Sequence, residues 1–505
     1  MSLKRNVVAN YLGQGWTALL GLAFLPAYIH YLGIEAFGLI GLFAVMQSWL
    51  SLLDMGMTPT LNREMARFTA GAHSAQSIRN LLRSIEVICF VLATLIILGV
   101  WGTSGYLANH WLNAEKLPVE AVAQALSLMS LVIALRFWEG IYRGSLYGLQ
   151  RQVFYNGANA LFATIRHGGA LAVLAWITPT IEAFFIWQSV VSLSSLAAFG
   201  VSVHRLLPNA PSHARFSIDA LVGIWKFASG MMGITFLSLL LTQVDKVMLS
   251  KMLRLEDFAY YTLAATISGA IYMVTGPVTQ AIYPRMVELA TSGRESELAA
   301  LYHQGAQLVT VMIAPAMLLL SIYAGGAVFV WSGDTSLARN TAPLLAPLVI
   351  GTFLNGLMWM PYQCQLAYGW TGFAIKVNIV AVVTLIPAIL WVVPVYGAIG
   401  AAWIWVILNA SYALIGIPIM HHRLLPKEKW RWYWSDGILP VIGALALMLL
   451  ACIFRPTEYD SRLTWFIFLI VTGSLSVVTA VLMAGELRSR LFEMAGRYLN
   501  PDHVS

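Results

Sequence analysis

Long apolar runs, each close to the length that crosses a bilayer, recur along this chain of 505 residues. A transmembrane helix needs about 20 consecutive residues that are mainly apolar. About fourteen runs of that kind can be marked, at residues 7–31, 36–58, 84–106, 119–143, 155–177, 181–204, 220–245, 257–282, 305–331, 341–364, 373–393, 397–420, 437–454 and 463–485. The strands of a membrane barrel would instead alternate in polarity over about ten residues. The sequence therefore predicts an all-α, polytopic membrane protein.

The composition excludes a water-soluble protein. Hydrophobic residues make up 59% of the chain and charged residues only 10%, whereas about a quarter of the residues in a soluble protein are charged. The net charge of +7 is therefore interpreted through the loops and not as affinity for nucleic acid. Cys89, Cys364 and Cys452 lie in or beside apolar runs, which favours buried thiols over a disulfide or a metal site.

The distribution of Lys and Arg predicts the topology. With the N-terminus in the cytoplasm, about twenty cations fall in cytoplasmic segments and about seven outside. This bias predicts an even number of spans and two cytoplasmic termini. The first apolar run contains Gln14, Trp16 and Pro26 and has no convincing small-residue cleavage site, so we expect a retained span and not a signal peptide.

A weak internal repeat divides the chain. The segment Tyr31–Arg63 has a fainter copy at Leu253–Arg285, about 221 residues later, with about one position in five identical. Glu35 and Glu256 hold corresponding places, each on the outer side before a helix returning inward. We do not expect the repeat itself to bind a ligand. The repeat predicts two related halves in a membrane, the second of which begins near Asp219.

Three cations, Arg136, Arg166 and Lys226, lie inside apolar runs. A charge near the bilayer centre costs roughly 2.5–3.5 kcal/mol, so these side chains should face protein or water. Several other polar residues fall on the same helix faces because they are spaced by three, four or seven positions. They are Glu139 and Arg143 with Arg136, Asn156 and Asn159 with Arg166, and Asn6, Asn10 and Gln14 on the first helix.

Two interpretations of these residues stay open. In the functional one, Arg136, Arg143, Arg166 and Lys226 line a hydrated cavity that accepts an anion such as a diphosphate. In the other, Arg136 and Glu139 form an internal ion pair, the Asn side chains join helices, and Lys226 extends to the interface. Arg166 has no local carboxylate, which favours binding.

Acidic groups within the apolar runs are scarce. Glu139 and Asp245 are the candidates for coupling to a proton or cation, although Asp245 could form a local ion pair with Lys246. The chain has no helical HExxH, no GxxxxGK[ST] and no GxSxG. We therefore expect a protein that is not an enzyme, with no cofactor, no metal site and no nucleic-acid partner.

Several segments are similar to the Wzx-like polysaccharide flippases, which belong to the multidrug, oligosaccharidyl-lipid and polysaccharide exporter superfamily. In the first half the resemblance rests on Asn10–Gly13, Leu25–Tyr28, Leu32–Gly38 and Leu53–Gly56. In the second half it rests on Gln243–Leu249, Tyr260–Ala264 and Tyr396–Ala402. It spans most of the chain, and it implies two six-helix lobes around a central cavity, at residues 1–218 and 219–424. In this chain two further helices and a cytoplasmic tail follow at 425–505.

The resemblance also implies a function. Members of the family move undecaprenyl-diphosphate-linked oligosaccharides across the bacterial cytoplasmic membrane by alternating access, in O-antigen or exopolysaccharide assembly. The implied partners are the lipid bilayer, a polysaccharide polymerase and a chain-length regulator. The two extra helices leave a lipid II-type flippase as an alternative, beside a multidrug antiporter or a membrane polysaccharide polymerase or ligase. No cavity residue is carried over from the family, so the predicted site rests on placement in the sequence.

Overall fold

The computed structural model describes residues 3–69, 71–210, 212–222, 225–457 and 459–489. The side chains at 3–10, at several positions between 220 and 284, and at 371 lie outside that description. The chain forms two compact units, residues 1–259 and 260–505, and each is described by itself. Apart from one bridge between Asn113 and Arg254, the described secondary structure is helical.

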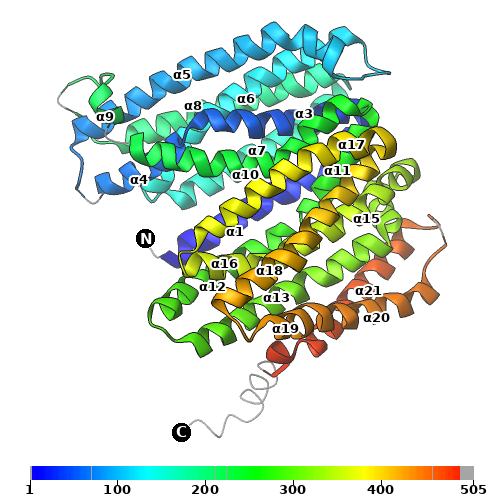
Figure 1. Cartoon of the computed structure of the whole chain (residues 1–505). Coiled ribbons are helices and arrows are strands. Elements are labelled where there is room, and N and C mark those ends of the chain that lie inside the picture. Colours follow the sequence, from blue (N-terminus) through cyan, green and yellow to red (C-terminus); the bar gives the residue numbers. More distant parts are fainter. Residues whose placement is uncertain (1–2, 70, 211, 223–224, 458, 490–505) are drawn as a thin grey trace, which may run out of the picture. The chain divides into compact units, whose positions relative to one another are not determined.

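The first unit is built around α6. This helix packs along α4, α5 and α8, while α7 packs against α1 and α8 (Figure 1). The helices are α1 (Leu3–Ala23), α2 (Leu25–Leu32), α3 (Ile34–Leu50), α4 (Met57–Thr69), α5 (Ala75–Tyr106), α6 (Val119–Gly148), α7 (Gln152–Trp176), α8 (Ile181–Leu206), α9 (Ile218–Val222) and α10 (Trp225–Met252). The next helix, α11 (Leu255–Gly269), begins in this unit and ends in the second.

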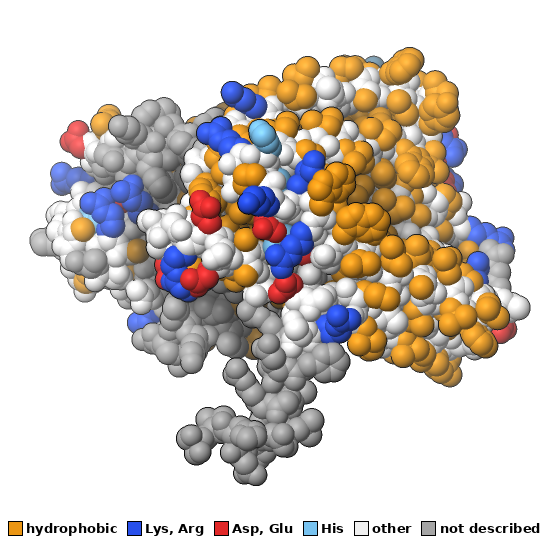
Figure 2. Space-filling view, turned by 60° about the horizontal axis from the view of Figure 1, so that its bottom comes forward, with side chains coloured by type: hydrophobic (Ala, Val, Ile, Leu, Met, Phe, Trp, Pro, Cys, Tyr) orange, Lys and Arg blue, Asp and Glu red, His pale blue; other side chains and the backbone are white. Residues whose placement is uncertain are grey.

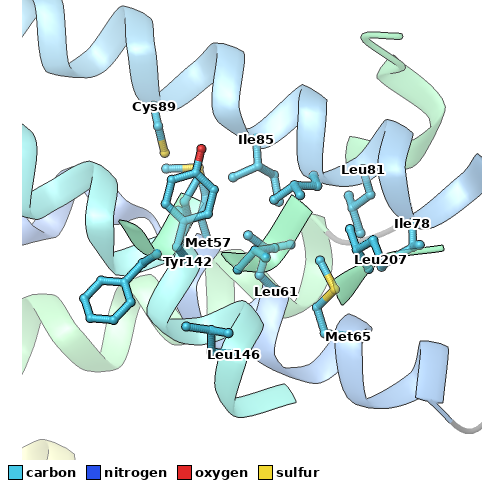
Figure 3. Packing of buried hydrophobic residues seen from close by; sticks show 14 of the residues in the cluster. Met57, Leu61, Met65, Ile78, Leu81, Ile85, Cys89, Tyr142, Leu146 and Leu207 are labelled. Carbon is cyan, nitrogen blue, oxygen red and sulfur yellow. The ribbon is translucent and has the colours of Figure 1, made fainter. Parts of the chain in front are cut away.

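A cluster of buried hydrophobic side chains joins α4 to α5 and α6. Met57, Leu61 and Met65 recur every four residues and so share one face of α4. This face packs against Ile85 of α5 and Leu146 of α6, among other buried residues (Figure 3). Each fully buried side chain of this size contributes about 1.5–3 kcal/mol relative to exposure to water. The cluster therefore fixes one end of α6, the helix that carries Arg136.

The second unit is built around α13. This helix packs against α12, α15, α20 and α21, and the last two pack against each other. The helices are α12 (Tyr272–Thr291), α13 (Glu295–Ile322), α14 (Ala324–Ser332), α15 (Thr335–Leu357), α16 (Trp359–Ala367), α17 (Thr371–Ser411), α18 (Ile417–Leu424), α19 (Lys429–Arg431), α20 (Leu439–Ala451) and α21 (Arg462–Met483). Two π-helical segments, η3 (Tyr412–Gly416) and η4 (Trp432–Ile438), lead into α18 and α20.

The longest helix, α17, is interrupted at Gly397. This residue has φ 58° and ψ −148°, a conformation that side-chain-bearing residues avoid. The break lies at the end of the Pro394–Gly397 turn, where the sequence predicts that one span ends and the next begins. The stretch Gly372–Leu424 has 53 residues, which is enough for two crossings of about 20 residues each.

The described helices confirm the class of fold. Ten of them are long and apolar enough to cross a membrane. Figure 2 shows broad hydrophobic areas free of charge, with Lys, Arg, Asp and Glu side chains gathered in separate patches. Such apolar areas are too large for a soluble monomer and fit contact with lipid. The total of fourteen crossings stays a prediction, as do the three segments with boundaries at 218 and 424.

The ends of two helices support a duplicated architecture. Residues His204–Pro208, at the end of α8, have the same five-residue sequence as His422–Pro426, at the end of α18. In both copies the second leucine is buried and the histidine and arginine are exposed. The same residues therefore end the same kind of helix in each half of the chain.

Candidate functional site

Two arginines from apolar helices, Arg136 on α6 and Arg166 on α7, lie in the interior of the first unit. The Nε atom of each is buried and has no hydrogen-bond partner among the described residues. The two side chains are near enough for their charges to repel each other. Like charges held in a protein interior cost free energy unless an anion offsets them. The pair is therefore suited to receiving an anionic group.

Arg136 is held by neutral side chains. Its Nη1 donates to Gln47 Oε1 at 3.2 Å, and its Nη2 donates to Gln188 Oε1 at 2.8 Å. Its guanidinium carbon lies 5.2 Å from the centre of the Phe43 ring. Two amides and a ring orient the guanidinium without cancelling its charge. The partners come from α3 and α8, so three helices converge on this group.

Glu139 lies one turn from Arg136 on the same helix but bonds elsewhere. Its Oε2 accepts a hydrogen bond of 2.5 Å from Ser195 Oγ on α8. The described side chains show no Arg136–Glu139 ion pair within 4.0 Å, although the two charges interact at longer range. Glu139 also interacts electrostatically with Arg166. The internal ion pair that was one interpretation of the sequence is thus not formed.

Arg166 is bordered by aromatic groups. Tyr155 on its own helix and Tyr28 on α2 interact with it electrostatically. The neighbouring His167 turns toward α2, where its Nδ1 lies 3.0 Å from Tyr28 Oη and its ring stacks on the tyrosine. This histidine packs between helices, which leaves the guanidinium of Arg166 as the group available to a ligand.

Arg143 is exposed at the far end of the α6 stripe. It hydrogen-bonds Tyr155 and interacts electrostatically with Asp54. Asp54 itself accepts from the backbone N–H and hydroxyl of Thr58, with Thr58 Oγ1 at 2.7 Å from Asp54 Oδ1. The structure therefore brings Arg136, Glu139, Arg143 and Arg166 into one charged region of the first unit.

Three of the residues predicted to line a cavity, Gln14, Asn156 and Asn159, lie on α1 and α7, which pack against each other. Asn159 Nδ2 donates to Thr17 Oγ1 at 3.4 Å, and Gln14 is exposed. Asn156 is buried, and its Nδ2 donates to the carbonyl oxygen of Gln152 at 2.8 Å. Interhelical contact thus accounts for part of this stripe, as one interpretation of the sequence holds.

The remaining predicted residues either lie away from this charged region or have side chains that the structure does not describe. Asp245 lies 3.4 Å from Lys246 Nζ, as expected for a local ion pair. The side chains of Asn6, Asn10 and Lys226 are outside the described part of the structure. In the described residues, no group of three or more His, Cys, Asp and Glu side chains is arranged to hold a metal ion.

Sequence reasoning missed a buried ionic network in the second unit. His303 on α13 contacts Asp436 through Nδ1 and Glu428 through Nε2, the latter at 2.8 Å. Gln307 donates to Asp436 Oδ1 at 3.0 Å and accepts from the backbone N–H of Glu486 at 3.0 Å. The signal available in the sequence was His303 and Gln307 four residues apart on an apolar helix. The network joins α13 to the segments on either side of the last two helices.

Comparison with known proteins places the chain in a family. Residues 3–290 match the family model described as polysaccharide biosynthesis protein, which is more than half of the chain. The chain belongs to the polysaccharide biosynthesis protein family.

The individual proteins to which the chain is similar are distant relatives. The chain is 21% identical over 418 residues to the "Putative O-antigen transporter" of Shigella flexneri, and the match covers 81% of this chain and 96% of that protein. Among solved structures, it is similar to the lipid II flippase MurJ in an inward closed conformation. That match has a TM-score of 0.72 and 13% identity, and it covers 96% of this chain and 99% of the other.

A second solved structure is an inward-facing multidrug resistance transporter of the MATE family. Its TM-score is 0.63 at 15% identity, with 82% of this chain and 96% of the other covered. At such identities the likeness concerns the fold. Together with the ten apolar helices, it shows a multi-pass membrane protein of the polysaccharide biosynthesis protein family with the fold shared by MurJ and this MATE transporter. The predicted resemblance is confirmed at the level of family and fold.

Proposed function

We propose that this protein is a flippase for a polyprenyl-diphosphate-linked oligosaccharide in O-antigen or exopolysaccharide biosynthesis. It would move its cargo from the cytoplasmic to the periplasmic leaflet of the bacterial inner membrane, with both of its termini in the cytoplasm. The observation that carries the proposal is the interior pair Arg136 and Arg166, whose Nε–H groups have no acceptor in the described residues. The family and the resemblance to an O-antigen transporter support the class of cargo.

The diphosphate is the group that these arginines are suited to hold. A guanidinium offers paired N–H donors that match phosphate oxygens, and charge-assisted hydrogen bonds are about twice as strong as neutral ones. Arg136 is already oriented by two glutamine amides, so little further ordering is needed on binding. Arg143 and Lys226 are proposed to attract the diphosphate at the cytoplasmic entrance.

The remaining parts of the cargo need different surroundings. Gln14, Asn156 and Asn159, with Asn6 and Asn10, are proposed to face the sugars, whose hydroxyls exchange hydrogen bonds with amides. The prenyl chain would stay in lipid, because moving it through a polar path forfeits about 0.8 kcal/mol per methylene. Exposure to the two leaflets would alternate between two states of the lobes.

Glu139 and Asp245 are proposed as the coupling groups, and Glu139 has the stronger structural support. It interacts electrostatically with both Arg136 and Arg166. Loss of its negative charge on protonation would raise the net positive charge beside the proposed diphosphate site. A proton could in this way change the affinity for the cargo between the two leaflets.

A multidrug antiporter with this fold is the weaker candidate, because a cationic drug would be repelled by two arginines without an acidic partner within 4.0 Å in the described residues. A lipid II-type flippase would use the same diphosphate chemistry. The two cargos are separated by phenotype, since loss of surface polysaccharide leaves cell growth intact whereas loss of a lipid II flippase stops wall synthesis.

Replacing Arg166 with Ala tests the proposal. Removing a charged hydrogen-bond donor from a buried site costs about 1.5–3 kcal/mol, so affinity for a diphosphate should fall about ten- to a hundredfold. We expect surface polysaccharide, measured by gel and immunoblot, to be lost at an unchanged level of membrane-inserted protein. Binding of undecaprenyl diphosphate to purified protein should weaken in parallel.

The matched control is Arg205→Ala, which removes an exposed arginine at the end of α8. It should leave surface polysaccharide at the level of the unchanged protein. Normal polymer in an Arg136→Ala/Arg166→Ala double variant would contradict the proposal.

A further inference from the structure

The two glutamates of the internal repeat hold the same loop. Glu35, at the start of α3, is buried, and its carboxylate accepts three backbone N–H groups. The donors are Glu115 at 2.5 Å, Lys116 at 2.8 Å and Leu117 at 3.0 Å. Glu256, at the start of α11, accepts from Lys116 Nζ at 2.6 Å. The corresponding residues of the two repeat copies therefore converge on one short segment, Leu112–Leu117, which we name the strap.

The strap is also joined to the α10–α11 turn through its backbone. The Asn113 carbonyl oxygen accepts from Leu255 N–H at 2.9 Å. Its side-chain Nδ2 donates to the carbonyl oxygens of Lys251 at 3.0 Å and Leu253 at 3.3 Å. Asn113 and Arg254 form the one β-bridge in the described residues.

Charged pairs complete the contact, and all of them lie at the surface. Arg254 contacts Glu115 at 3.3 Å and Asp257 at 3.0 Å. The side chains of Lys116 and Glu256 are 63% and 24% exposed, while Glu35 is 4% exposed. The two attachments of the strap therefore differ in kind. On one side, three backbone N–H groups bind a buried carboxylate. On the other side, exposed ion pairs accompany one backbone hydrogen bond and the two hydrogen bonds of the Asn113 side chain.

This difference decides which attachment opens first. An exposed ion pair shifts an equilibrium by about fivefold at most, whereas a buried carboxylate left without donors is strongly disfavoured. The Glu35 attachment should hold the strap permanently to α3. Release of the attachment to the α10–α11 turn breaks the exposed ion pairs and the hydrogen bonds of Asn113, an exposed residue whose polar groups water can reach.

We propose that the strap is the latch of the outer gate: its attachment to the α10–α11 turn closes the path to the periplasm, and its release opens that path. The inference rests on the proposed transport function and on the predicted topology, which places both the strap and the turn outside. By the predicted lobes, Glu35 belongs to the first lobe and Glu256 to the second. The latch thus spans the elements that alternating access must separate.

Gly38 adds a steric limit to the closed latch. A Cβ at this position of α3 would lie 2.7 Å from the carbonyl oxygen of Leu255 and 3.0 Å from a methyl of the same residue. Backbone cannot yield as a flexible side chain does, so Gly38→Ala should push the turn away from α3. Like Glu256→Gln, this substitution should favour the open latch.

A reversible cross-link tests the proposal. Asn113→Cys and Arg254→Cys, in a Cys452→Ser background, place two thiols at bridged backbone positions. We expect the reduced double variant to support surface polysaccharide, the oxidised form to lose it, and reductant to restore it. The matched control is Ser104→Cys/Ser127→Cys, whose parent hydroxyls lie 3.3 Å apart between α5 and α6 and should remain together during transport. Undiminished polymer from fully cross-linked Asn113→Cys/Arg254→Cys would overturn the latch.

A second measurement separates failure of the latch from failure of the proposed transport function. In proteoliposomes of fixed orientation, a membrane-impermeant maleimide applied from the outer side labels Gln14→Cys. Lys116→Gln/Glu256→Gln and Gly38→Ala should each speed this labelling, and the 113–254 cross-link should slow it. These changes would support the latch even if no variant altered polysaccharide. Equal labelling in all forms would overturn it, whatever the cargo.

Discussion

Arg136 shows how a charge can be kept inside a membrane protein without being neutralised. Its hydrogen-bond partners are the amide oxygens of Gln47 and Gln188, and its face rests on Phe43. Amide dipoles reduce the cost of burial while leaving a full positive charge for a ligand. Glu139 is hydrogen-bonded to Ser195, forms no ion pair with Arg136 within 4.0 Å, and acts on the charge of Arg136 only at longer range. The choice of neutral partners is what makes the residue suitable for binding an anion.

This arrangement predicts the effect of Gln188→Glu. A carboxylate at this position would replace the amide oxygen that lies 2.8 Å from Arg136 Nη2, and an ion pair would form. We expect affinity for undecaprenyl diphosphate to fall about ten- to a hundredfold, because the cation is then already paired. Titration of purified protein measures this, and surface polysaccharide should fall with it.

Gln188→Met, which has nearly the same shape but no charge, is the control. It removes one neutral bond to Arg136 and should weaken binding much less than Gln188→Glu. Equal losses in the two variants would show that orientation of the arginine, and not its free charge, governs affinity.

The partners of single residues were the part that the sequence could not supply. Spacing along α6 places Glu139 beside Arg136 and so suggested an ion pair, but the actual partners are 89 and 52 residues away. The buried place of Glu35 was missed for the same reason, since its three donors lie about 80 residues later. What could be predicted was that Arg136 and Arg166 must avoid lipid, because that follows from the cost of charge alone.

At the scale of elements, the network around His303 fastens the last helices to the second unit. His303 and Asp436 are fully buried, and Gln307 connects Asp436 to Glu486, three residues after the end of α21.

We expect His303→Gln to destabilise the second unit by about 1–3 kcal/mol, because it removes the imidazole that contacts both Asp436 and Glu428 and leaves Gln307 as the donor to the buried Asp436. Thermal unfolding in detergent, followed by the fluorescence of the buried Trp432 near His421, measures the change. Glu297→Gln, which breaks an exposed pair with Arg294, should cost at most about 1 kcal/mol.

A second variant tests the cause. His303→Leu/Asp436→Leu replaces both buried partners with apolar groups and should recover much of the stability, as is found when buried ion pairs are exchanged for hydrophobic residues. If the double variant unfolds as readily as His303→Gln, the contribution of this network lies in shape and not in charge.

Elements were the most predictable level. Apolar runs of about 20 residues located most of the long helices, since length and hydropathy alone decide what can cross a bilayer. The break near Gly397 was foreseen, since the two predicted apolar runs 373–393 and 397–420 are separated there. The π-helical segments η3 and η4 had no signal in the sequence, because they depend on packing where α18 and α20 begin.

For the molecule as a whole, the repeat ties sequence to architecture. Glu35 and Glu256 occupy equivalent positions in the sequence and bind one strap in the structure. The shared ends of α8 and α18 extend the relation to a second place in each half. Two weak signals, at opposite ends of the six-helix segments, thus agree on a spacing of about 220 residues.

The topology of the extra helix pair yields the last prediction. If α20 and α21 each cross the bilayer, Lys427 before them is cytoplasmic and Asp460 between them is periplasmic. In a Cys452→Ser background, the native thiols Cys89 and Cys364 are buried and should not react. A membrane-impermeant maleimide should therefore label Asp460→Cys in intact cells and Lys427→Cys only after the membrane is opened. Both residues are exposed, so access to reagent depends on the side of the membrane and not on burial.

Two further positions serve as controls for the two sides of the membrane. Ala114→Cys, in the strap, should behave like Asp460→Cys, and Ala72→Cys, between α4 and α5, should behave like Lys427→Cys. This pattern follows from the bias of about twenty cytoplasmic cations against seven outside. Labelling of Asp460→Cys only after opening, with Ala114→Cys labelled in intact cells, would mean that the pair does not span the membrane. The number of crossings would then be twelve, and the buried His303 network would anchor a surface element.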